Sequence, residues 1–292
     1  MSTHLAQEAS RSADLVLSRV EFQRIAQILN EVSGITLPES KENLVYSRLS
    51  KRVRQLRLPS FKKYCDFIAS PEGADERQEL LSALTTNVTR FFREPHHFTD
   101  LANNVIGPLK SKATSSTKLR IWSSACSTGE EPYSIAMTIL DSLPRAGDMD
   151  IRVLATDIDP RVVARATAGT YAESIIEPLS SAQRTKYLTH DGAQWSVSRD
   201  VRNLIRFAEL NLTNRFPMAG KFDAIFCRNV AIYFDKPTQE ALWVRLVNQL
   251  GPGGRLYIGH SERITGPALD HLDLAGITAY CKKASPSQNG RK

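Results

Sequence analysis

Three short stretches of the chain contain side chains that could bind a nucleoside. The first is "IWSSACSTGEEPYSIAM", residues 121 to 137, where an apolar run passes into small side chains, one glycine and two acids before a helical pattern. A phosphate-binding loop would offer several glycines and a lysine, and a dinucleotide-binding loop would read G-x-G-x-x-G. The stretch has neither pattern, so we do not expect a phosphate ligand. Glu130 or Glu131, near the start of the expected helix, suits an ammonium group instead.

The other two stretches each place polar side chains after an apolar run. Asp157 ends "VLATD", where an acid can accept hydrogen bonds from both ribose hydroxyls, and "FCRNVAIYF" offers Arg228, Asn229 and Tyr233. Gly129 in the first stretch would let the backbone approach a ligand closely. Each signal is weak alone, since an Asp after a strand is more often a helix cap. Together they favour S-adenosylmethionine, which carries adenosine, an ammonium and a sulfonium.

The surrounding patterns predict two kinds of domain. Residues 15–90 have helical periodicity and form an expected all-helical domain, followed by a linker at 91–118 that includes "KSKATSSTK". Residues 119–284 alternate strand and helix, which predicts an α/β fold with a mostly parallel sheet. An interruption at about 171–208, read as strand-like runs around a polar turn, predicts a small antiparallel β-subdomain, and 285–292 are an expected disordered tail. Ligands of such sheets bind at the carboxyl ends of the strands, so the three stretches should converge there.

Composition limits where the protein works. The chain has 292 residues and no run of 18 apolar residues, so no membrane span is expected. The first 20 residues lack a hydrophobic segment, which argues against a secretory signal and favours the cytoplasm. The four cysteines lie far apart without metal-binding spacing, so we expect reduced thiols and no metal.

The net charge of +7 indicates an acidic partner, and the excess is concentrated in residues 41–63. Candidate partners are nucleic acid, an anionic membrane and an acidic protein surface. One expected helix there has Val45, Leu49, Val53 and Leu56 on one face and Arg48, Lys51, Arg52 and Arg54 largely on the other. A solvated face and a docking surface are both open interpretations of the four cations.

Five stretches together resemble the CheR family, the chemotaxis receptor methyltransferases. They are "LTTNVTRFFREPHHF", "WSSACSTGEEPYSIAM", "ATDIDPRVV", "FDAIFCRNVAIYFDK" and "LGPGGRLYIGHSE", and their order and spacing agree as well as their residues. The resemblance runs from about Phe22 to Lys282. It implies a helical amino-terminal domain for receptor recognition, followed by a Rossmann-like S-adenosylmethionine-dependent methyltransferase sheet carrying a small β-subdomain. The implied activity is methyl esterification of glutamate side chains on chemoreceptors, with S-adenosyl-L-homocysteine as product.

The resemblance also implies the site residues. Together with Ala125 and Gly129 of the first stretch, the expected cofactor contacts are Asn87, Thr89, Arg93, Glu130, Asp157, Asn211, Leu212, Cys227, Arg228 and Asn229. Arg93 and Tyr233 match the two positions nearest the transferred methyl, so we expect Arg93 to hold the carboxylate or cofactor and Tyr233 to close the methyl pocket. A glutamate is already ionised at neutral pH, so the reaction needs no general base.

The expected partners are the cytoplasmic methylation helices of chemoreceptors, which are rich in Glu and Gln. The cationic helix could dock on them, bringing a cytoplasmic protein to membrane-associated receptor arrays. Some family members bind a receptor's carboxyl-terminal peptide through a glycine-rich loop, but "LTHDGAQWSV" has one glycine, so we expect no peptide tether, and no membrane insertion.

Two alternative functions remain. A nucleic-acid methyltransferase would fit the basic helix, but the chain lacks the N/D-P-P-[FY] motif for extruded bases. A non-catalytic module that senses S-adenosylmethionine would be recognised by the loss of Arg93 or Tyr233, and both are present.

Overall fold

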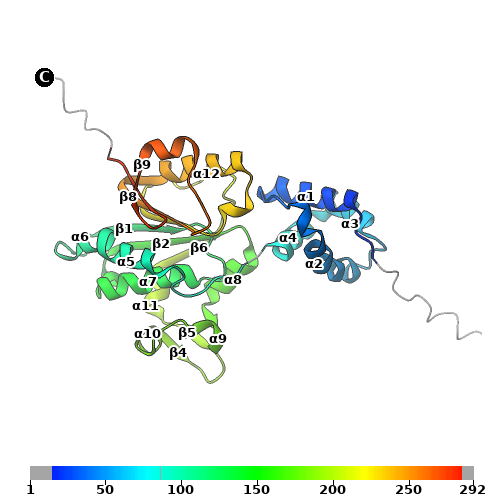
Figure 1. Ribbon diagram of the computed structural model, residues 1–292. Coiled ribbons are helices and arrows are strands. Elements are labelled where there is room, and N and C mark those ends of the chain that lie inside the picture. The colour runs from blue at the N-terminus through cyan, green and yellow to red at the C-terminus, as the bar shows by residue number, and fades with distance from the viewer. Residues whose placement is uncertain (1–14, 86, 285–292) are drawn as a thin grey trace, which may run out of the picture. The chain divides into compact units, whose positions relative to one another are not determined.

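The computed structural model describes residues 15–85 and 87–284, and these two ranges form two compact units (Figure 1). The expected disordered tail at 285–292 lies outside the described residues. Within the described ranges, no helix is long and apolar enough to cross a membrane.

The first unit is all-helical. Its α-helices are α1 (Arg19–Ser33), α2 (Glu42–Gln55), α3 (Phe61–Ala69) and α4 (Ala74–Leu84), with short 3-10 turns η1 (Glu39–Lys41) and η2 (Pro71–Gly73). Ser18 and Glu21 form a capping box at the start of α1, and Gly34 ends the helix in a left-handed conformation with a φ of 75°. Val45, Leu49 and Val53 of α2 are fully buried, as the helical pattern predicts.

The second unit is built on a seven-stranded sheet with the order β6-β2-β1-β7-β8-β10-β9. The strands are β1 (Lys118–Ser123), β2 (Asp150–Asp157), β6 (Ile205–Glu209), β7 (Phe222–Cys227), β8 (Leu250–Ile258), β9 (Leu272–Gly276) and β10 (Ala279–Lys282). The first five in the sheet order pair in parallel, whereas β10 pairs antiparallel to both β8 and β9. The mostly parallel sheet is thereby confirmed, but the sequence patterns did not reveal β9.

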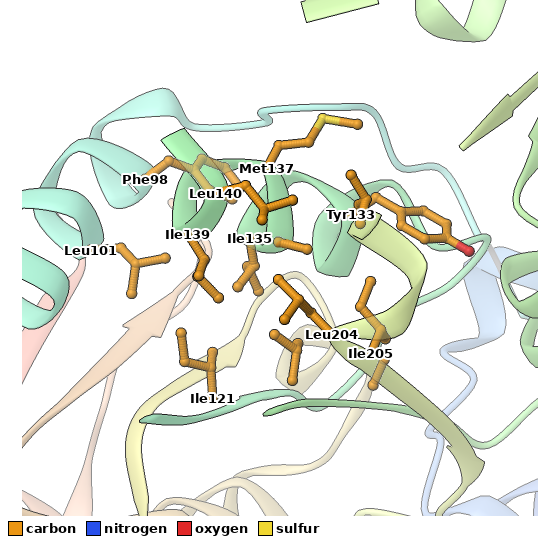
Figure 2. Packing of buried hydrophobic residues seen from close by; sticks show 14 of the residues in the cluster. Phe98, Leu101, Ile121, Tyr133, Ile135, Met137, Ile139, Leu140, Leu204 and Ile205 are labelled. Carbon is orange, nitrogen blue, oxygen red and sulfur yellow. The ribbon is translucent and has the colours of Figure 1, made fainter. Parts of the chain in front are cut away.

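Helices cover the sheet on both faces, with α7 (Glu130–Ser142) and α12 (Lys236–Gln249) on opposite sides in Figure 1. Further helices are α8 (Pro160–Ala168) and α11 (Arg199–Asn203), with 3-10 turns η4 (Ala146–Asp148), η5 (Ala231–Tyr233) and η6 (Gly266–His271). Figure 2 shows Ile135 and Ile139 of α7 packed above Ile121 of β1, with Leu204 and Ile205 beside them. All five side chains are almost completely buried and belong to one core cluster.

The stretch 91–118, expected as a linker, is largely ordered structure of the second unit. It contains α5 (Pro95–Asp100), the π-helical turn η3 (Leu101–Ile106) and α6 (Gly107–Lys110). Phe98 and Leu101 are buried in the same core cluster as α7, so this segment covers part of the sheet.

The predicted β-subdomain is present, but its boundaries differ from those expected. Its three-stranded sheet has the order β3 (Thr170–Tyr171), β5 (Trp195–Val197), β4 (Leu188–His190), all antiparallel, with α9 (Glu173–Ile176) and α10 (Ser181–Tyr187) beside it. Residues 195–210 contain two strands, as the strand-like runs predict, but these strands do not both belong to the insertion. The helix α11 follows β5, and β6 then pairs in parallel with β2 in the main sheet.

Candidate active site

The candidate site lies where β1, β2, β7 and β8 end. The loop after β1 is anchored to both neighbouring strands: Ser124 donates from its amide and its hydroxyl to the Phe226 carbonyl, and the Cys126 amide donates to Thr156. This double anchoring is possible because β1 pairs with both β2 and β7. The loop is therefore held directly above the crossover point of the sheet, where ligands of open α/β sheets bind.

Asp157, Asn87 and the loop meet at this edge. The Asp157 carboxylate accepts from the Ser127 amide at 2.8 Å and the Asp159 amide at 3.1 Å. The Ser127 hydroxyl donates to the Asn87 carbonyl at 2.9 Å, and the Asn87 amide lies 3.4 Å from Asp159. Burial raises the pKa of Asp157 although the two amides oppose the shift. Each carboxylate oxygen keeps acceptor capacity, so further donors such as ribose hydroxyls would stabilise the charged form.

Gly129 has a different role from the one expected. Its φ is +102°, and a Cβ there would lie 2.9 Å from the Tyr171 hydroxyl and 3.0 Å from the Ala166 Cβ. The space beside Gly129 is thus filled by the protein's own α8 and β3. The glycine is required by a left-handed turn and close internal packing, whereas we expected it to admit a ligand.

The two acids at the start of α7 lie in different surroundings. Glu130 is 2% exposed, accepts from the Thr128 hydroxyl at 2.7 Å, and has its pKa raised by burial. Glu131 accepts from Ser123 at 2.7 Å and pairs with the Arg228 guanidinium at 2.9 Å. Glu131 is therefore neutralised within the protein, and Glu130 is the acid that suits an ammonium ligand.

Arg228 connects three segments instead of standing free. Its side chain is 2% exposed and donates to Glu131 and to the Arg93 carbonyl, while Glu94 lies 3.4 Å from it. The Arg93 guanidinium donates to the Val88 carbonyl at 3.1 Å, so Arg93 is half-buried against its own segment. A deeply buried guanidinium with two acids holds the segment before α5 against the end of β7.

Glu94, His96 and His97 lie close enough to suggest a metal site. However, the Arg228 guanidinium already supplies positive charge 3.4 Å from the Glu94 carboxylate. Burial raises the pKa of Glu94, but Arg228 and His260 outweigh it and hold that pKa below its usual range. We therefore assign Glu94 to an ion pair with Arg228 instead of a cation site.

The remaining residues that we expected to contact the cofactor differ in how deeply their side chains are buried. Cys227 is fully buried at the end of β7, and burial raises its thiol pKa well above the usual value. Leu212 is buried, and its carbonyl accepts from Arg245 at 2.6 Å, while the Asn211 side chain caps Thr213. Ala125, Thr89 and Tyr233 are half-buried, Tyr233 in η5. The candidates Arg48, Lys51, Arg52 and Arg54 belong to α2 of the first unit.

Sequence reasoning missed Glu262. This side chain follows β8, is 3% exposed, and accepts hydrogen bonds from four backbone amides, those of Asn229, Val230, Ala231 and Gly259. The only signal was an acid at the end of "GHSE", just beyond an apolar strand. Nothing in that pattern indicated which loop the acid would hold.

A mostly parallel sheet that ends in an antiparallel hairpin, with a buried acid after β2 and a second acid opening α7, defines an S-adenosylmethionine-dependent methyltransferase. The chain belongs to the CheR methyltransferase family. The family's SAM-binding domain matches residues 87–281 and its all-alpha domain matches residues 20–85.

Relatives of similar length carry consistent names. The chain is 51% identical over 252 residues to a probable chemotaxis protein methyltransferase of Rhizobium etli, covering 85% of this chain and 94% of that protein. It is 40% identical over 272 residues to a chemotaxis protein methyltransferase of Salmonella typhimurium, covering 91% of each.

Proposed function

We propose that the protein transfers a methyl group from S-adenosylmethionine to glutamate side chains on the cytoplasmic helices of chemoreceptors. The products would be glutamate methyl esters and S-adenosyl-L-homocysteine, formed during adaptation in chemotaxis. The observation that carries the proposal is the near full-length similarity to proteins named chemotaxis protein methyltransferase. The chemistry of the site supports it.

The proposed reaction needs alignment more than acid or base chemistry. When bound, the sulfonium supplies an activated methyl; a carboxylate oxygen forms the new C–O bond, and the electron pair of the broken C–S bond stays on sulfur. The acceptor glutamate has a reference pKa of about 4.3 and is ionised at neutral pH, so no proton moves. The protein's contribution is to align the reacting atoms and remove water from the nucleophile.

The residues present fit this cofactor. Asp157 would accept from the ribose hydroxyls and Glu130 would face the ammonium, because both carboxylates are buried and have raised pKa values. The loop at Asn211 and Leu212 is tied to Asp157, since the Leu210 amide donates to the Asp157 carbonyl at 2.9 Å. This loop would flank the adenine. In our proposal Arg93 orients the carboxylate or cofactor, and Tyr233 closes the methyl pocket.

We further propose that α2 contacts the acidic methylation helices, and that binding needs no receptor peptide tether. The β4–β5 connection is short, with one glycine, Gly192, in the exposed stretch 191–194. In this proposal the protein acts in the cytoplasm at membrane-associated receptor arrays.

The test uses labelled S-adenosylmethionine and receptor cytoplasmic fragments. We expect protein-bound label that alkali releases as volatile methanol, because a carboxyl methyl ester is base-labile. A fragment whose methylatable glutamates are changed to alanine is the control and should stay unlabelled. Base-stable label, or label on added nucleic acid, would contradict the proposal. Calorimetry with a receptor carboxyl-terminal peptide tests the tether, and measurable binding would refute tether independence.

A further inference from the structure

Glu262 is a buried carboxylate whose four hydrogen-bond donors are all backbone amides. The amides of Val230 and Ala231 donate to Oε1 at 2.9 and 2.8 Å. The amides of Asn229 and Gly259 donate to Oε2 at 2.9 and 2.6 Å. Burial raises the pKa of Glu262, but the four amides oppose this, as expected for an acceptor in its charged form. One side chain thus joins the segments that leave the paired strands β7 and β8.

The segment held by Glu262 begins with a left-handed turn. Asn229 has a φ of +58°, a conformation that asparagine adopts more readily than most residues with a side chain. A Cβ on Gly259 would lie 2.4 Å from the side-chain Nδ2 of Asn229 and 2.9 Å from its backbone nitrogen, so Asn229 packs directly against that glycine. Carboxylate and glycine together determine where Asn229 lies.

The position of Tyr233 also depends on the hydrogen bonds of Glu262. It ends η5, whose first residue, Ala231, donates to Glu262, and its own amide donates to the Val230 carbonyl at 3.1 Å. Two of the four amides bound by Glu262 therefore belong to the turn that carries Tyr233. A loss of the carboxylate would free this turn without touching Asp157 or Glu130.

We propose that Glu262 is a positioning residue for methyl transfer: it holds Asn229 and the Tyr233 turn in the arrangement that the reaction requires. The inference rests on the proposed function, because it assigns a role in the transfer step. A purely structural role would affect stability alone. The two roles differ in whether turnover falls while the protein remains folded.

The test is Glu262→Gln, because glutamine keeps the shape but offers one acceptor oxygen, so two of the four amides lose their partner. At saturating cofactor and receptor, we expect kcat to fall at least tenfold and the receptor KM to change less than threefold. Hydrogen exchange should accelerate in residues 229–233 and remain slow in β1. Asp141→Asn is the matched control: it alters an acid that accepts from Tyr187 at 2.6 Å in the same unit, at the end of α7 opposite Glu130, and should leave kcat within twofold.

Gly259→Ala keeps the test decisive if Glu262→Gln does not fold. Its methyl would displace both the side chain and the backbone of Asn229 while the Glu262 carboxylate is retained, and the same loss of kcat is expected. Normal kcat in a folded Glu262→Gln protein, or in Gly259→Ala if only that variant folds, would overturn the inference and leave the proposed function intact. A wild-type protein that binds cofactor but labels no receptor would overturn the proposed function, and the transfer role with it.

Discussion

The carboxylates of the site differ in their surroundings, and these surroundings give them different roles. Glu131 is neutralised by Arg228, Glu262 by backbone amides, and Asp157 only in part by the amides of Ser127 and Asp159. Glu130 accepts from one hydroxyl. Burial raises the pKa of all four carboxylates, so these acids differ in the groups that oppose the rise.

Substitutions of Arg93 and Tyr233 test the proposed roles near the methyl group. We expect Arg93→Ala and Tyr233→Ala to lower kcat/KM at least tenfold, about 1.4 kcal/mol, because the acceptor would be less well oriented. Cofactor binding, measured by calorimetry, should change less than methyl transfer. Tyr233→Phe keeps the aromatic ring and removes the hydroxyl, so its turnover shows which of the two groups the reaction needs.

The matched control is Arg90→Ala, an exposed arginine three residues before Arg93. It should retain normal turnover. If Arg93→Ala and Tyr233→Ala also turn over near the normal rate with unchanged cofactor affinity, neither residue takes part in the reaction.

The buried His97 side chain should make the folding stability of the protein sensitive to acid. Burial, together with Arg228 and His96, lowers its pKa to about 3, and the opposing effect of Glu94 does not restore it. The unfolded chain has a histidine pKa of about 6.5 and binds the proton first as the pH falls. The contribution of neutral His97 to the unfolding free energy is thus fully present above pH 6.5 and is lost as the pH falls toward 3.

Between pH 7.5 and 5.5 the wild type should lose about 1.4 kcal/mol more unfolding free energy than His97→Gln. Urea denaturation at the two pH values measures this difference. Equal losses in both proteins would show that His97 takes up its proton in the folded state.

At the scale of an element, α2 divides its cations between structure and surface. Arg48 donates to the carbonyls of Ala83 and Thr85 at 3.1 and 2.9 Å. Arg52 binds Glu76, which is 4% exposed, at 2.6 Å. Only Lys51 and Arg54 of the four candidates are exposed. The expected four-residue docking face therefore reduces to these two.

We expect Lys51→Glu with Arg54→Glu to raise the receptor KM several-fold and to leave cofactor affinity unchanged, because exposed charge acts on association. The same reversal at the exposed Lys110 and Lys112 of the second unit is the control. An unchanged receptor KM in steady-state assays at low salt would remove α2 from docking.

Arg52→Ala should act on stability instead. It removes the cation from buried Glu76, leaving the Tyr64 hydroxyl as a donor to that carboxylate. We expect a loss of about 2 kcal/mol, since an unpaired buried acid is costly and Arg52 is partly exposed. Thermal unfolding measures it, and an unchanged melting temperature would contradict the structural assignment.

For the whole molecule, every candidate cofactor residue lies within 87–284, whereas the docking candidates lie within 15–85. A protein consisting of residues 87–292 should therefore bind S-adenosylmethionine with a Kd within about threefold of the full chain. Its receptor methylation should fall much further. Calorimetry and the methanol-release assay measure the two quantities. A cofactor Kd raised tenfold or more, in a folded fragment, would show that the first unit contributes to the site.

The sequence was sufficient for the alternating elements, the loop after β1 and the place of Asp157 at the end of β2, because strand ends and turns are local patterns. Asn87 entered only through the family resemblance, and the cofactor roles of these residues stay predictions. It was insufficient for Arg228 and Glu262, whose roles depend on pairing across the fold. Arg228 and Glu131 are 97 positions apart, and their ion pair exists only because β7 lies beside β1. The segment 91–118 was misjudged for a related reason: its apolar residues are buried by packing against α7, which composition does not reveal.

The contact between Tyr171 and the loop at Gly129 divides the β-subdomain into a base fixed to that loop and an exposed tip. The tyrosine hydroxyl donates to the Thr128 carbonyl at 2.8 Å, so the base of this insertion is also a wall of the cofactor loop. The hairpin tip at 191–194 is exposed, and a Cβ on Gly192 would meet nothing within 4 Å. A longer or altered tip would therefore leave the loop at Gly129 undisturbed, whereas a change at Tyr171 would remove a hydrogen bond and a packing contact from that loop.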